Sequence, residues 1–90
     1  MRIDTDMTTN TTAALKSALK AAIQIGDTEI DLSAVNEIDM AGLQVLLIAR
    51  HEAASRDAPL RIVNPSQAVR ELFTRCRLTH ALDSRVNAKA

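Results

Sequence analysis

Aromatic residues, cysteine and glycine are scarce in this chain of 90 residues, which has one aromatic, Phe73, and one cysteine, Cys76. Large aromatics supply the most buried area per residue, so the core must be built mainly from aliphatic side chains. A lone cysteine cannot form an internal disulfide, and nothing therefore calls for an oxidising compartment. Gly26 and Gly42 are the two glycines, so no glycine-rich phosphate loop exists.

An excess of charge of either sign is also lacking, because eleven basic residues balance eleven acidic ones. Such a chain has no field to attract nucleic acid and no basic helix for a membrane surface. No apolar run reaches the roughly 18 residues of a membrane span, and the acidic N-terminus is not a signal peptide. We therefore expect a cytoplasmic protein with one domain over residues 1–90, which neither binds nucleic acid nor inserts into a membrane.

Apolar spacing predicts helices that alternate with strands. Residues 28–33 alternate strictly and predict a strand, and residues 60–63 predict a second one. A helix over about residues 40–55 is expected after Asp39, a good N-cap, and a third helix after Ser66. A first helix, which Gly26 would end, carries the stripe Leu15, Ala18, Leu19, Ala22 and Ile23.

The ends of the chain carry weaker signals. Residues 1–10 are polar and allow a short edge strand around residues 2–4. A short strand or turn is expected at 78–82, and a frayed end at 83–90. Strands separated by helices of this length pair in parallel through right-handed crossovers.

Candidate catalytic residues are few and do not form a constellation. His51 and His80 are far apart in sequence, and Cys76 falls on the apolar stripe Val69, Leu72, Phe73 of the third helix. A buried cysteine behaves as a small hydrophobe, and no metal-ligand spacing is present. The sequence therefore predicts no enzyme activity, no metal and no cofactor.

The helix at 40–55 has a first turn of small residues, Ala41 and Gly42. Glycine there costs about 1 kcal/mol relative to alanine. Either tight packing against the strand or the close approach of a partner must compensate, and the sequence leaves both open.

The same helix is apolar almost all round. Leu43, Leu46, Leu47 and Ala54 suffice for a core face, so Ala41, Val45 and Ile48 point elsewhere. Such a helix is either buried on both sides or has an exposed apolar face that can bind another protein. Since complete burial is hard in a small domain, we predict a partner-binding patch of Ala41, Val45 and Ile48.

Three motifs together resemble the STAS domain of bacterial anti-sigma factor antagonists and of sulfate transporters, over roughly residues 11–82. They are Asp31-Leu32-Ser33, then Ile38-Asp39-Met40-Ala41-Gly42-Leu43, then Leu60-Arg61-Ile62-Val63-Asn64 with Val69, Leu72 and Phe73. The resemblance implies an α/β fold: a small mixed or parallel sheet of about four strands with three to four helices. The N-terminal strand region is shortened here, which exposes an edge through which a homodimer could form.

The resemblance also implies partner switching. Such domains bind an anti-sigma factor with a histidine-kinase-like ATPase fold, which phosphorylates a serine just after the motif aspartate. Met40 occupies that position here and cannot accept a phosphate. The resemblance thus implies a non-catalytic antagonist without its switch, and we expect the partner to contact Asp39, Met40, Ala41, Gly42, Leu43, Val45 and Ile48.

Other functions stay open at this stage. Related single-STAS proteins of lipid transport dock on an ABC-transporter ATPase, and others are accessory proteins of chemotaxis signalling clusters. A nucleotide-binding role is the alternative from a different class, because some STAS domains have been linked to nucleotides.

Overall fold

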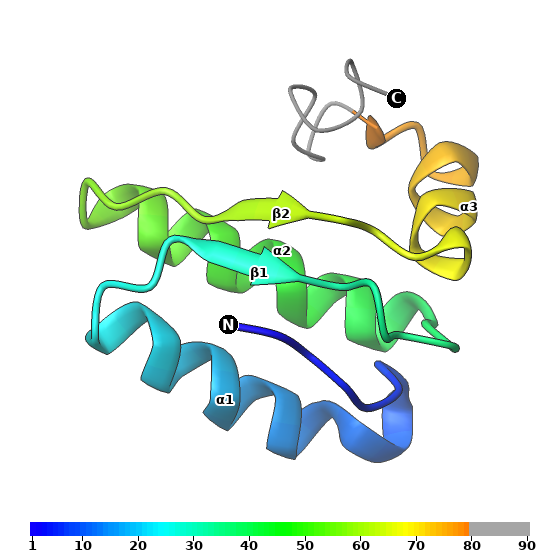
Figure 1. Ribbon diagram of the computed structural model, residues 1–90, viewed down its shortest axis with the longest axis horizontal. Helices are drawn as coiled ribbons and strands as arrows, with labels where there is room; N and C mark the ends of the chain where they lie inside the picture. The colour runs from blue at the N-terminus through cyan, green and yellow to red at the C-terminus, as the bar shows by residue number, and fades with distance from the viewer. Residues whose placement is uncertain (80–90) are drawn as a thin grey trace.

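The computed structural model describes residues 1–79. Strands and helices alternate as the apolar spacing predicts (Figure 1). The elements are a short 3-10 helix η1 (Thr9–Thr11), α1 (Thr12–Gln24), β1 (Glu29–Asp31), α2 (Met40–Ser55), β2 (Arg61–Val63) and α3 (Gln67–Arg75). The short strand or turn expected at 78–82 lies mostly outside the described residues, and so does the end at 83–90.

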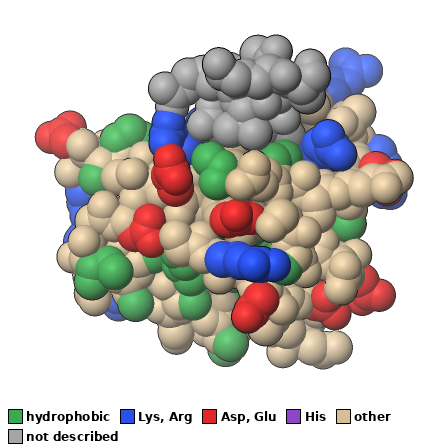
Figure 2. Space-filling view, viewed as in Figure 1, with side chains coloured by type: hydrophobic (Ala, Val, Ile, Leu, Met, Phe, Trp, Pro, Cys, Tyr) green, Lys and Arg blue, Asp and Glu red, His purple; other side chains and the backbone are tan. Residues whose placement is uncertain are grey.

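The two strands form a parallel pair connected through α2, with Ile30 directly opposite Ile62. Both isoleucines are buried, whereas Glu29 and Arg61 are opposite each other on the other face and form an ion pair. Figure 2, viewed from that face, shows acidic and basic side chains gathered over the strands. One face of the sheet is therefore apolar around Ile30 and Ile62, and the other carries the Glu29–Arg61 ion pair next to the buried Val63.

The N-terminal segment runs beside β1 and covers its edge. Arg2 forms a parallel bridge with Asp31, and the Ile3 N–H donates to the Asp31 carbonyl at 3.0 Å. A second isolated bridge joins Met7 to Ile38. The α/β class and the shortened N-terminal strand region are confirmed, but residues 1–79 form two strands rather than about four. The N-terminal segment contributes two isolated bridges, at Arg2 and at Met7, in place of a further strand.

Helix boundaries follow the predicted caps. Helix α2 spans the predicted residues 40–55, and the Asp39 carboxylate accepts a hydrogen bond from the Gly42 N–H. The Ser66 hydroxyl accepts one from the Val69 N–H at the start of α3. Gly26, which follows the end of α1, has a φ of +79°, the left-handed conformation that favours glycine.

One hydrophobic core joins the three α-helices and the two strands, with Phe73 fully buried in it. Helices α1 and α2 pack side by side (Figure 1). Ile3 and Met7, which precede the residues 11–82 that carry the resemblance, are also buried in this core. The sequence did not predict their burial, because the residues around them are mostly polar.

Candidate partner-binding site at the start of helix α2

Asp39 ties the start of α2 to the N-terminal segment. Its two carboxylate oxygens are shared between two chain segments: Oδ1 accepts the Gly42 N–H at 3.1 Å, and Oδ2 accepts the Thr9 N–H at 3.0 Å. The Thr9 hydroxyl donates to the same Oδ2 at 3.2 Å. Asp39 is therefore more than an N-cap, because it also fixes η1 against the beginning of α2.

These hydrogen bonds keep the Asp39 carboxyl ionised. The Gly42 N–H, and after it the Thr9 N–H, hold the pKa of Asp39 below its usual value. Each donor stabilises the carboxylate over the neutral acid, as does the positive end of the helix dipole. Because its oxygens accept hydrogen bonds from Gly42 and Thr9, this carboxylate has a structural role.

Gly42 is required by packing within the chain. A Cβ added at this position would lie 2.0 Å from the carbonyl oxygen of Met7. That carbonyl is itself fixed, because it accepts a hydrogen bond from the Asp39 N–H at 3.0 Å. Of the two explanations that the sequence left open, tight packing is the one observed, and the neighbour is the N-terminal segment.

The predicted contact residues separate into an inner and an outer set. Gly42, Leu43 and Val45 are buried, with Val45 facing α1, and Ala41 is half-buried. Met40 and Ile48 are 51% and 62% exposed. Helix α2 is thus covered on two sides, by the sheet and by α1, whereas Met40 and Ile48 remain exposed.

Cys76 lies beside Met40, a proximity that sequence spacing could not indicate across 36 positions. Its Sγ is 3.8 Å from the Met40 Sδ, and the thiol is partly exposed. The end of α3 therefore borders the start of α2, and soft, polarisable sulfur atoms occupy this part of the surface. The apolar stripe of α3 correctly placed Cys76 near the core but gave no sign of this neighbour.

Within residues 1–79, no three His, Cys, Asp or Glu side chains gather in a way that could hold a metal ion. His51 is exposed on α2, and His80 lies outside the described residues.

None of the helices within residues 1–79 has the length and apolar character that a membrane span requires.

Comparison with protein families identifies the fold. The family model described as "Mlab, STAS domain" matches residues 1–84, so the chain belongs to the STAS domain family. Comparison with curated proteins gives no match. The family assignment confirms the resemblance read from the three motifs. STAS domains as a family are non-enzymatic modules of regulation and protein interaction.

Proposed function

We propose that this STAS domain is a constitutive docking module, similar to an anti-sigma factor antagonist, that holds a regulatory ATPase partner without phosphorylation control. The contact is made along the side of α2 that stays accessible, from the helix start to its middle, and is here called the α2 surface: the exposed Met40 and Ile48, with the half-buried Asp39 and Ala41 beside Met40. The carrying observation is that Met40 is 51% exposed at the position where the family resemblance places the phosphoacceptor serine.

Exposure of large apolar side chains supports this surface. Among residues 1–79, the exposed large hydrophobic residues are Ile25, Met40 and Ile48, and two of these three are on α2. Methionine is flexible and polarisable, which suits an adaptable contact. A neutral chain adds no strong field of its own, so the contact depends on shape and apolar burial.

The buried residues of the predicted contact set support the α2 surface without being exposed themselves. Gly42 lets the N-terminal segment pack directly on α2, while Leu43 and Val45 anchor the helix in the core. Together with the Asp39 cap, they hold the α2 surface rigid before binding. A preorganised surface loses less conformational freedom on association, which favours affinity.

The ATPase of an ABC transporter is the second partner class, as it is for related single-STAS proteins of lipid transport. Met40 favours this class in one respect: a thioether cannot accept a phosphoryl group, and a permanent transporter subunit needs no switch. In both classes the chain acts by binding, through the same surface.

The experiment compares Met40→Asp with wild type in binding to the purified candidate ATPases. Gln67→Asp is the matched control, because Gln67 is the exposed first residue of α3 just as Met40 is of α2. We expect Met40→Asp to weaken binding about tenfold or more, as loss of a central contact does. Equal binding of Met40→Asp and wild type would overturn the proposed surface.

Met40→Ser separates the two partner classes. With ATP and a kinase-like anti-sigma factor, this variant should gain one phosphate, detected by intact mass, and then dissociate. With the ATPase of an ABC transporter, it should stay unphosphorylated and bound.

A further inference from the structure

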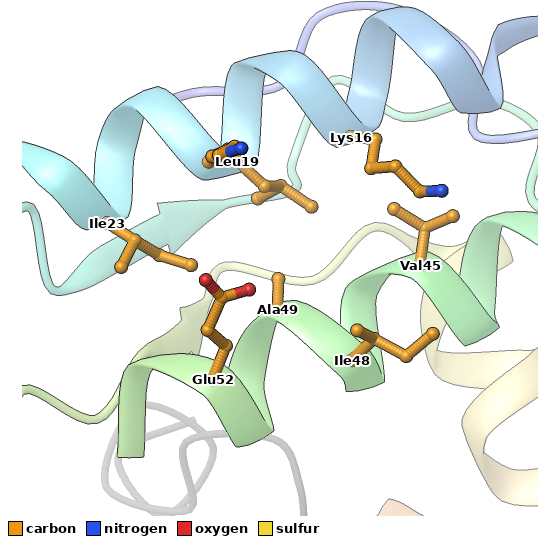
Figure 3. A pocket seen from close by; sticks show the side chains of 8 residues that line it. Lys16, Leu19, Ile23, Val45, Ile48, Ala49 and Glu52 are labelled. Carbon is orange, nitrogen blue, oxygen red and sulfur yellow. The ribbon is translucent and has the colours of Figure 1, made fainter. Parts of the chain in front are cut away.

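A groove runs between α1 and α2, and it shares Ile48 with the α2 surface but does not include Met40. Figure 3 shows the side chains that the two helices direct toward this space. The groove is lined by Lys16, Leu19, Lys20 and Ile23 from α1 and by Val45, Ile48, Ala49 and Glu52 from α2.

The floor of this α1–α2 groove is apolar and its volume is small. Leu19, Ile23, Val45 and Ala49 are core residues whose outer edges form the floor, and Ile48 is 62% exposed at its side. The volume is about 240 Å³, below the range of roughly 300–1,000 Å³ for sites that enclose a small molecule. Its size suits side chains inserted by a protein partner.

Two lysines give the groove its charge. Lys16 and Lys20 are exposed and one helical turn apart, so their ammonium groups repel each other. Neither has an ion-pair partner among residues 1–79, whereas Glu52 on the opposite side is 3.8 Å from Arg56. The α1 side of the groove therefore carries two positive charges, and the single carboxylate that lines the groove, that of Glu52, comes from the α2 side.

A second copy of this chain does not supply the complementary charge from its described helices. Helix α1 contains no acidic residue, and α2 and α3 contain one each, Glu52 and Glu71. A helix that fits between two packed helices inserts a row of its side chains into their groove. From Lys16 to Ile23 the groove follows about two turns of α1, or roughly 10 Å.

We propose that the α1–α2 groove docks an amphipathic helix of another protein, with apolar residues at positions i, i+3, i+4 and i+7 and carboxylates on the flank that faces Lys16 and Lys20. This inference goes beyond the proposed function, since it specifies the secondary structure and charge of a binding element. It does not require contact with Met40.

The test uses two synthetic helical peptides with the same leucines at i, i+3, i+4 and i+7, one flanked by glutamates and the other by lysines. Binding to the full chain is measured by fluorescence anisotropy, and the site is mapped by NMR amide shifts. We expect the glutamate peptide to bind at least about tenfold more tightly and to shift amides of both α1 and α2.

Lys16→Gln combined with Lys20→Gln should remove most of that preference. The double variant Arg70→Gln and Arg75→Gln, on exposed positions of α3, has the same change in net charge and should retain it. Met40→Asp should also retain it, which separates this inference from the proposed function.

Several outcomes would overturn the inference. They are equal binding of the two peptides, no binding of either, or amide shifts confined to α3. Preferential binding of dodecanoate or of phosphatidylglycerol vesicles at Lys16 and Lys20 would also do so, because it would assign the groove to a lipid.

Discussion

Gly42 and Met7 are in contact through their backbones: a Cβ on Gly42 would lie 2.0 Å from the carbonyl oxygen of Met7. The contact joins the first turn of α2 to a segment more than 30 positions earlier in the chain. It is the reason why a residue with poor helix propensity is found in the first turn of this helix.

Gly42→Ala should therefore destabilise the protein although alanine is the better helix former. The added methyl group meets backbone atoms, so relief requires displacement of the N-terminal segment, and overpacking of this kind costs about 1–3 kcal/mol or more. Urea denaturation should show the loss as a lower midpoint.

Gly26→Ala is the matched control for that experiment. Nothing lies within 4 Å of a Cβ at Gly26, so only its positive φ opposes the substitution, at about 1–2 kcal/mol. If Gly42→Ala were as stable as wild type, the close approach to Met7 would be contradicted.

Val45→Asp and Ile48→Asp should have opposite outcomes, although both replace apolar residues of the predicted patch. Val45 is 8% exposed and Ile48 is 62% exposed. A charge forced into the contact with α1 should cost about 2–4 kcal/mol, whereas the exposed site should tolerate it within about 0.5 kcal/mol. Thermal unfolding followed by circular dichroism measures both, and equal melting temperatures would contradict the separation into inner and outer residues.

Acid should weaken the junction that Asp39 forms. Its pKa is lowered in the folded state, chiefly by the Gly42 N–H and then by the Thr9 N–H. The stabilisation is therefore fully present above the pKa of the unfolded chain, about 4, and is lost as pH falls through the lower folded value.

Asp39→Asn tests that pH dependence. An amide can still accept the Gly42 N–H but directs donors at Thr9, so the variant should be less stable than wild type at pH 7. The difference in stability between wild type and Asp39→Asn should be smaller at pH 3 than at pH 7, as measured by urea midpoints. Asp57→Asn, at an exposed position, controls for the loss of one negative charge, and a constant gap at the two pH values would refute the assignment.

Phe73→Ala should be among the most damaging substitutions in this chain. Phe73 is the sole aromatic residue and is fully buried, and its truncation should cost about 3–5 kcal/mol. Domains of this kind have about 5–15 kcal/mol in total, so a large part of the stability is lost. Leu72→Ala, at the half-buried neighbour, should lower the urea midpoint less, and a reversed order would contradict the placement of α3.

Local signals in the chain were sufficient for most of the fold. The spacing of Leu15, Leu19 and Ile23 predicted α1, and Asp39 and Ser66 marked the starts of α2 and α3. These features depend on neighbours within one or two helical turns, so they can be recognised from the sequence alone. The motifs also sufficed to recognise the STAS family.

Pairwise contacts between distant segments needed the tertiary structure. Nothing near Met7 in the sequence indicates that it packs on Gly42, and nothing near Cys76 indicates that its thiol lies 3.8 Å from the Met40 sulfur. Likewise, the periodicity of α2 showed an apolar helix but not that α1 covers Val45 and leaves Ile48 exposed.

The sequence by itself thus determined the order of helices and strands, the caps of α2 and α3, and the absence of a phosphoacceptor at position 40. Only the tertiary structure decided which residues of α2 are exposed. The physical reason is that caps and periodicity arise within a few residues, whereas exposure depends on which distant segments pack against each side of a helix.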